Sequence, residues 1–399
     1  MTSVCGAIAA NISPLLFLTF RQHYGISYSL LGFLVVLNFG TQLLLDIILS
    51  FFSYRINLAY AVRSTPAVMG VGLLLLAASP IIFPAKPYIG LTIGTIVFSA
   101  GNGMCEVLTS PTIAAIPSKD SDKLLSRLHS CYAWGLLFLV AFSTGFFVLF
   151  GVENWQYLVL ILTILPLFTT ILFAFSPIPP MKTEKQASGV LRLFCNPTVI
   201  LYFFCILLGG ASEVTMSQWC SGYLESALGI SKTVGDLCGV ALFGAALGLG
   251  RSLYTKFGKN IHTVLFAGAF GACICYIAAA FSNNPVVGVI ACASTGFCVS
   301  MLWPGCLIAV TERLPHGGVS LFALMAVGGD VGASLCPQAV GAITDMVMAA
   351  PGAESIASQL GISIEQFGMK TGMAFAALFP IAATILFYLA KRSARGVRA

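Results

Sequence analysis

The chain has 399 residues, of which 58% are hydrophobic and only 9% are charged, and its mean hydropathy is +0.95. Soluble proteins carry charge on roughly a quarter of their residues, so this composition excludes a water-soluble globular protein. The formal net charge of +6 comes from cations spread thinly between apolar segments, unlike the clustered basic face of a protein that binds nucleic acid.

Long apolar runs recur along the whole chain. A helix that crosses a hydrocarbon layer of roughly 30 Å needs about 20 apolar residues, because lipid offers the backbone no hydrogen-bond partner. Such helices are expected near residues 4–20, 28–52, 61–83, 88–113, 124–150, 155–175, 199–224, 234–257, 263–281, 286–311, 319–348 and 367–390. We therefore predict an all-α integral membrane protein with twelve transmembrane helices in two six-helix bundles.

The longest polar stretch separates the sixth expected helix from the seventh. It contains PIPP followed by MKTEKQASG, a composition typical of a linker. The predicted organisation is an N-terminal bundle over residues 1–175, a cytoplasmic linker over 176–197 and a C-terminal bundle over 198–399.

The positions of the cations predict the orientation in the membrane. If both termini are cytoplasmic, all but four of the twenty Lys and Arg residues fall on the cytoplasmic side, the exceptions being Arg21, Lys86, Lys232 and Lys370. Loops rich in Lys and Arg stay in the cytoplasm. We predict a multi-pass protein of the cell (inner) membrane with both termini cytoplasmic.

A short repeat links the two halves. Gly-Ile-Ser occurs at 25–27 and again at 229–231, and Phe-Gly occurs at 39–40 and, at the same spacing, at 243–244. This register predicts a parallel duplication of a six-helix unit, in which solute sites lie near mid-membrane.

Charged residues inside a membrane are costly and are by default functional candidates. Glu106 shares a helix face with Asn102 and Ser110, at i, i+4 and i+8. Glu106 and Asn102 are therefore candidates for solute binding, and Glu106 also for proton coupling. The alternative for Glu106 is a structural hydrogen bond to a neighbouring helix.

A second acidic group lies in the seventh expected helix. Glu213 is followed by Gln218 and Trp219, and this mixture of acid, amide and aromatic side chains suits a sugar or polyol. These three residues are candidates for solute binding. Aromatic side chains of membrane proteins also serve as interfacial anchors.

Asp330 begins a polar stripe in the eleventh expected helix. Ser334 and Gln338 follow at i+4 and i+8, so Asp330 and Gln338 are candidates for solute binding, and Asp330 also for proton coupling. Alternatively, the neighbouring glycines only permit close packing, and Asp330 caps a helix that Pro337 interrupts.

The second expected helix contains polar residues at two depths. Asn38 and Gln42 lie one turn apart and are candidates to line a solute site, or else to join helices. Asp46, nearer the cytoplasmic end, precedes Arg55 and roughly matches Arg251 in the second half. These three charged residues predict a gate or a loop salt bridge.

The fifth expected helix opens with His129, and Tyr132 follows one turn later. Histidine titrates near neutral pH, so His129 is a candidate for a proton relay and Tyr132 for solute binding. A structural role for His129 beside Arg127 is an equal alternative.

Motifs for enzymatic chemistry are missing from the sequence. It contains no HExxH, GxSxG, Walker A or Rossmann glycine pattern, and its four histidines are widely scattered. We predict neither an enzyme nor an ATP-driven pump, and neither a metal site nor a bound cofactor.

Three blocks of sequence resemble the fucose permease family. They are EVLTSP at 106–111 with RLHS at 127–130, GASEV at 210–214, and the proline and glycines of 300–345, including Pro304, Gly328 and Gly329. The resemblance implies the major facilitator fold and proton-linked sugar symport, with Glu106 in proton coupling. Where that family has an Asn-Asp pair in helix one, this chain has Ser13 and Pro14, and Asp330 is a candidate to compensate.

The leading prediction is a secondary transporter that takes up a sugar or related polyol by proton-coupled alternating access. Its partners would be that solute, protons and the lipid bilayer, without nucleic acid, and a monomer would be the functional unit. The alternatives are an efflux permease for amphipathic compounds, which the many Phe residues would suit, and a membrane sensor of solute that does not transport it.

Overall fold

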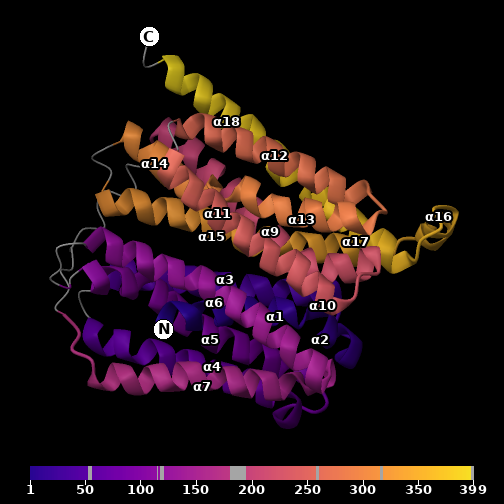
Figure 1. The fold of residues 1–399 in the computed structure, drawn as a ribbon, viewed down its shortest axis with the longest axis horizontal. Coiled ribbons are helices and arrows are strands. Elements are labelled where there is room, and N and C mark those ends of the chain that lie inside the picture. Colours follow the sequence, from indigo (N-terminus) through magenta and orange to yellow (C-terminus); the bar gives the residue numbers. More distant parts are fainter. Residues whose placement is uncertain are drawn as a thin grey trace. The chain divides into compact units, whose positions relative to one another are not determined.

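The computed structural model in Figure 1 describes residues 1–52, 56–114, 116, 121–179, 195–257, 260–314 and 318–396. Over these residues the secondary structure is helical, without a β-strand. Contacts between residues divide the chain into two compact units. Unit 1 comprises Met1–Ile26 and Leu34–Gln186, and unit 2 comprises Ser27–Phe33 and Ala187–Ala399.

The first half of the chain contributes seven α-helices and one short 3₁₀ helix among the described residues. They are α1 (Thr2–Leu15), α2 (Phe17–Tyr24), α3 (Tyr28–Phe52), α4 (Leu58–Ile82), α5 (Pro87–Ala114), α6 (Ser121–Phe150), η2 (Val152–Asn154) and α7 (Trp155–Phe175).

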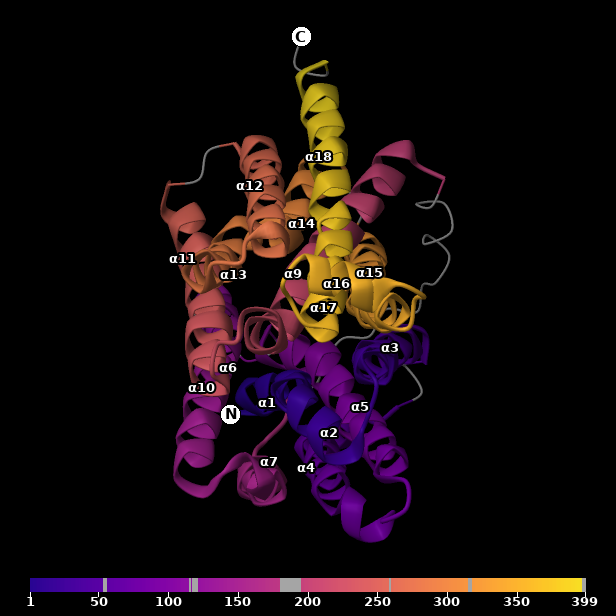
Figure 2. The ribbon, with the colours of Figure 1, turned by 90° about the vertical axis from the view of Figure 1, so that its right-hand side faces the viewer.

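The second half contains the remaining helices, several of them interrupted. They are α9 (Pro197–Leu228), α10 (Lys232–Val234), the π-helical η3 (Gly235–Ala241), α11 (Leu242–Phe257), α12 (Ile261–Phe281), α13 (Pro285–Val299), α14 (Leu302–Arg313), α15 (Gly318–Met348), α16 (Ala353–Gln359), α17 (Ile364–Ala376) and α18 (Leu378–Gly396). Within each unit the long helices run side by side (Figure 1 and Figure 2).

Each predicted transmembrane span coincides with a helix or with helices joined at a break. Ten helices of the described chain are long and apolar enough to cross a membrane, and α1 with α2, bent by 43°, form an eleventh candidate. The predicted span over 124–150 is α6, whose apolar part, Trp134–Phe150, is shorter. Helix α16 was not predicted.

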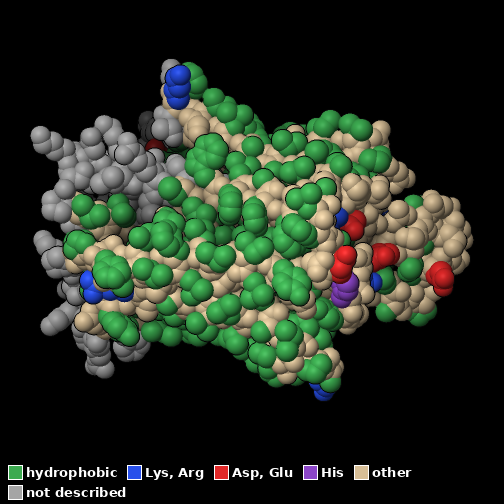
Figure 3. Space-filling view, turned by 60° about the horizontal axis from the view of Figure 1, so that its bottom comes forward, with side chains coloured by type: hydrophobic (Ala, Val, Ile, Leu, Met, Phe, Trp, Pro, Cys, Tyr) green, Lys and Arg blue, Asp and Glu red, His purple; other side chains and the backbone are tan. Residues whose placement is uncertain are grey.

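The outer surfaces of the helices are apolar. Helix α7, for example, exposes Ile164, Phe168, Ile171 and Phe175. On the face that Figure 3 shows, apolar side chains dominate and charged ones gather towards the two ends. A soluble monomer does not expose such extended apolar surface, so these faces fit contact with lipid.

Each unit has its own aromatic core. In unit 1 the ring of Trp155 packs edge-on against Phe20, with ring centroids 5.0 Å apart. In unit 2 the buried Trp219 lies 5.9 Å from the ring of Tyr28. Both tryptophans are almost completely buried.

The glycine of the Gly-Ile-Ser repeat has the same backbone conformation in both copies. Gly25 ends α2 with φ 63°, and Gly229 ends α9 with φ 66°. Glycine adopts this left-handed conformation without the steric cost that other residues incur. The repeat therefore marks equivalent helix ends in the two halves.

Residues 27–33 open α3 and are grouped with unit 2. The Asp345 carboxylate accepts hydrogen bonds from the backbone N–H groups of Tyr28, at 3.2 Å, and Ser29, at 2.6 Å. These N–H groups have no partner within the helix, so Asp345 of α15 caps α3. Of the predicted linker, residues 180–194 lie outside the described chain.

Candidate functional site

Pro14 frees a backbone carbonyl group in α1, which then accepts a hydrogen bond from a side chain. Pro14 in α1 has no N–H to donate to the Ala10 carbonyl four residues earlier. That carbonyl instead accepts a hydrogen bond of 3.3 Å from Nδ2 of Asn38 in α3. Pro14, which stands where the resembling family has Asp, thus contributes to a structural contact between α1 and α3.

Asn38 is the centre of a buried amide network. Its Oδ1 accepts from Nε2 of Gln42 at 2.9 Å and from Oγ of Ser99 at 2.7 Å. Oε1 of Gln42 in turn accepts from Nδ2 of Asn102 at 2.8 Å. The structure thus brings together three predicted residues, Asn38, Gln42 and Asn102, but bonds them to one another, in keeping with the alternative that they join helices.

Glu106 differs from this network because its side chain is exposed. It lies one helical turn beyond Asn102 in α5, so its carboxylate extends the polar face that begins with the amides. No Lys, Arg or His side chain that the structure describes forms an ion pair with it. The side chain of Ser110, predicted on the same face, lies outside the described residues.

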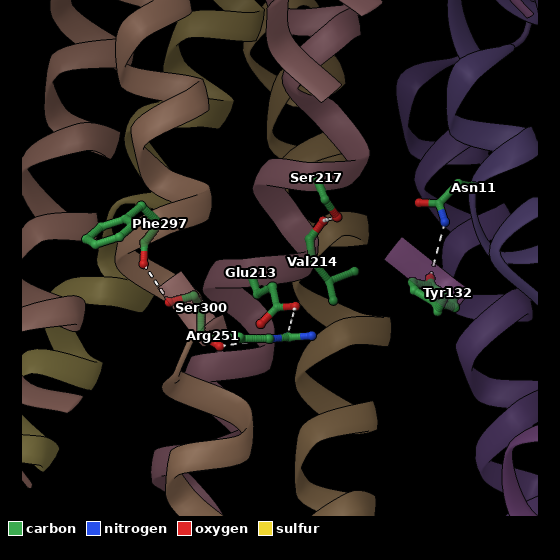
Figure 4. Close-up of polar contacts among 8 residues, drawn as sticks. All are labelled: Asn11, Tyr132, Glu213, Val214, Ser217, Arg251, Phe297 and Ser300. Atoms are coloured by element: carbon green, nitrogen blue, oxygen red, sulfur yellow. Dashed lines mark hydrogen bonds and ion pairs between the residues drawn. The ribbon is translucent and has the colours of Figure 1, made fainter. Parts of the chain in front are cut away.

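Tyr132 of α6 is bonded to a residue that the sequence did not single out. Nδ2 of Asn11 in α1 donates to its Oη at 3.2 Å and to the Ala7 carbonyl at 2.9 Å (Figure 4). Asn11 is buried, whereas 40% of Tyr132 is exposed. The Tyr132 hydroxyl is therefore hydrogen-bonded to a buried residue, while part of the Tyr132 side chain is exposed. His129 lies in α6, but its side chain is outside the described part of the chain.

Glu213 of α9 and Arg251 of α11 form an ion pair. Nη2 of Arg251 lies 3.0 Å from Oε1 of Glu213, and Figure 4 shows the two side chains pointing toward each other. The Glu213 side chain is 15% exposed and that of Arg251 44%. Arg251, predicted as part of a gate, is thus the counter-ion of a predicted solute-binding residue.

The Ser300 carbonyl holds the same arginine from the other side. Nε of Arg251 donates to it at 3.0 Å. Ser300 lies in the break between α13 and α14, and the residue four positions on is Pro304, which has no N–H. The proline therefore leaves the carbonyl available for Arg251, a second contact that the sequence analysis missed. The available signal was Pro304 inside an apolar run, because a proline frees the carbonyl four residues earlier.

The other two predicted gate residues stay untested. Arg55 lies outside the described residues. Asp46 lies in α3 and is half-buried.

Gln218 and Trp219 are both buried in α9. Nε1 of Trp219 donates to the Pro337 carbonyl at 2.9 Å, so its polar group already serves to pack α9 against α15. Oε1 of Gln218 is buried and has no hydrogen-bond partner among the described residues.

The polar stripe of α15 lies in a tightly packed region. Asp330 is buried, and Gln338 is half-buried with no partner for Oε1 in the described chain. A Cβ atom at Gly332 would lie 2.0 Å from the Leu207 carbonyl oxygen. This close approach of α15 to α9 agrees with the packing alternative for the glycines.

Comparison with known sequences gives one match. The profile of the Major Facilitator Superfamily matches residues 1–337. No curated protein sequence matches the chain.

Several solved transporters have a similar fold. A bacterial homologue of the human lysosomal transporter Spinster, in an inward-facing and occupied conformation, aligns over 98% of this chain and 95% of its own. The sequence identity is 13% and the TM-score is 0.79. A D-xylose–proton symporter aligns over 95% of this chain and 95% of its own, with 15% identity and a TM-score of 0.73. The fucose:proton symporter of E. coli aligns over 97% of this chain and 96% of its own, with 14% identity and a TM-score of 0.60. At such identities the likeness concerns the fold alone.

Proposed function

This chain belongs to the major facilitator superfamily, and we propose that it carries a small hydroxyl-rich solute, a sugar or related polyol, together with a proton. As a member of that superfamily it is a multi-pass membrane transporter and not an enzyme. The solute and the coupling ion are the proposal.

The single observation that carries the proposal is the setting of Glu106. This carboxylate lies in a membrane-spanning helix, is exposed, and has no cationic partner among the described side chains. A charged carboxylate in a membrane is expensive, and binding a proton neutralises it. A carboxylate that gains and loses a proton during transport couples the solute to the proton gradient.

Buried acceptor atoms support a solute that carries hydroxyl groups. Oε1 of Gln218 in α9 and Oε1 of Gln338 in α15 have no donor among the described residues. A buried acceptor without a donor costs about 1–3 kcal/mol, so a solute that donates hydrogen bonds would recover this cost. A sugar or polyol can do so, whereas the apolar surface of an amphipathic efflux cargo cannot.

The named functions of similar structures agree with this proposal. Two of them are described as a D-xylose–proton symporter and a fucose:proton symporter. For this chain we further propose a location in the cell (inner) membrane with cytoplasmic termini, from the bias of Lys and Arg, and function as a monomer.

The proposal is tested in proteoliposomes that contain a pH-sensitive dye. Sugars and polyols are added outside to the wild type, to Glu106→Gln and to the control Glu354→Gln, which removes an exposed carboxylate from α16. We expect one solute class to acidify the lumen with the wild type and the control, but not with Glu106→Gln. Transport of amphipathic compounds alone, or acidification that persists in Glu106→Gln, would contradict the proposal.

A further inference from the structure

We infer that Glu213 is a second proton-binding carboxylate and that Arg251 is its exchangeable counter-ion, a positioning residue that the proton displaces during transport. This inference rests on the proposed function, because it adds a group to the same coupling reaction.

The argument begins with the unequal exposure of the two partners. Glu213 is 15% exposed, whereas 44% of Arg251 is accessible. A charged guanidinium in a membrane-spanning helix faces water or the bundle interior rather than lipid. When the pair separates, Arg251 can therefore be hydrated where it is, but the carboxylate stays buried.

A buried carboxylate without a counter-ion is unstable. Its second oxygen, Oε2, already has no donor among the described residues. Losing Arg251 would leave both oxygens unsatisfied, and ionised groups in that state are neutralised. Separation of the pair thus requires a proton to bind Glu213, and release of that proton requires Arg251 to return.

The anchor of Arg251 connects this exchange to the break between α13 and α14. Its Nε binds the Ser300 carbonyl, which Pro304 leaves free at the break between α13 and α14. A Cβ atom at the preceding Gly250 would lie 2.7 Å from Cβ of Ser300, so the backbone of α11 touches the break directly. Bending at the break would move the guanidinium relative to Glu213.

Arg251 is the charged group that acts on Glu213 within the described chain. Other polar groups on elements near α9 bond elsewhere. Asp236 pairs with Lys232 and Ser221, Glu365 with Tyr28, Lys370 with Ser282 and Asn283, Arg313 with Ser393, and Tyr276 with the Ser212 carbonyl. Asp330 of α15 is the remaining buried acid on a helix packed against α9.

The step is a proton transfer without covalent chemistry on the solute. A proton from water binds the Glu213 carboxylate and forms a carboxylic acid. The N–H···O⁻ contact with Arg251 is lost, and the arginine stays cationic. The reverse step releases the proton and restores the ion pair.

The test compares two assays in the same proteoliposomes. Exchange of labelled for unlabelled solute requires no net proton movement, whereas accumulation under an imposed pH gradient does. The central variant is Glu213→Gln with Arg251→Gln, which removes both charges and leaves no isolated buried one. Arg63→Gln is the control, because Arg63 is exposed and its Nη2 binds the Ser176 carbonyl.

We expect the double variant to retain exchange and to carry fewer protons per solute than the wild type. Arg251→Lys should restore part of the proton movement that Arg251→Gln loses, because lysine keeps the charge. Pro304→Ala supplies an N–H that competes for the Ser300 carbonyl, so it should lower accumulation while exchange persists.

The two assays distinguish a failure of the proposed function from a failure of the inference about Glu213 and Arg251. If the wild type moves no protons with any solute, the proposed function fails. If the wild type does so and the double variant moves as many protons per solute, the inference about Glu213 and Arg251 is wrong while the proposed function stands. Loss of exchange and accumulation together in Arg251→Lys and Pro304→Ala would also overturn it, because that result indicates a structural role.

Discussion

Replacing Arg251 by glutamine should destabilise the protein more than replacing its partner Glu213. Removing one member of a fully buried ion pair costs about 3–5 kcal/mol, whereas surface pairs contribute about 0–1 kcal/mol. Arg251→Gln leaves a carboxylate that is only 15% exposed, so we expect a cost of about 2–3 kcal/mol, below the fully buried limit. Glu213→Gln leaves an accessible guanidinium, and its amide oxygen still accepts a hydrogen bond, so about 1 kcal/mol is expected.

The assay is thermal unfolding of the purified protein in detergent. A loss of 1 kcal/mol lowers Tm by about 2–4 °C for chains of 150–250 residues and by about half as much for a chain of 399 residues. This gives roughly 2–6 °C for Arg251→Gln and about 1–2 °C for Glu213→Gln. The double variant should unfold close to Glu213→Gln, because it leaves no buried charge. An equal or larger loss of Tm in Glu213→Gln would refute the reasoning from exposure.

Three further variants test the packing around the site. Asn38→Ala removes the common acceptor of two buried donors and should cost about 2–3 kcal/mol, seen as a lower Tm; an unchanged Tm would contradict the network. Gly229→Ala places a side chain at φ 66° and should cost roughly 1–2 kcal/mol, whereas Gly145→Ala, in open space, should be neutral or stabilising. Trp219→Phe removes the N–H that binds the Pro337 carbonyl and should lower Tm while transport persists; loss of transport at unchanged Tm would instead favour solute binding by Trp219.

The helices could be predicted from the sequence because each apolar run is long enough to span lipid and is bounded by polar residues. The span over 28–52 agrees with α3 and that over 155–175 with α7. The breaks were harder to predict. Pro14 and Pro304 lie inside apolar runs, and their effect depends on which side chain of a facing helix reaches the freed carbonyl.

The partners of the polar residues could not be predicted from spacing. Glu213 and Arg251 lie on different helices, and no periodicity within one helix relates them. Asn38, Gln42 and Asn102 were expected to line a solute site, but whether amides face a ligand or one another depends on helix rotation. Asn11 was overlooked because a single amide in an apolar helix carries no pattern.

The capping of α3 by Asp345 also depends on contacts that are distant in sequence. The acid lies in α15, and the N–H groups of Tyr28 and Ser29 that it accepts belong to the start of α3. Sequence predicted a boundary after residue 175 but could not assign 27–33 to the other unit.

The most direct test of proton-coupled transport is accumulation of labelled solute in proteoliposomes under an imposed pH gradient, measured with Glu106→Gln beside the wild type. Our account predicts that the wild type concentrates the solute, and that Glu106→Gln still exchanges it but does not concentrate it. Accumulation by Glu106→Gln equal to that of the wild type would contradict the role of this carboxylate in coupling.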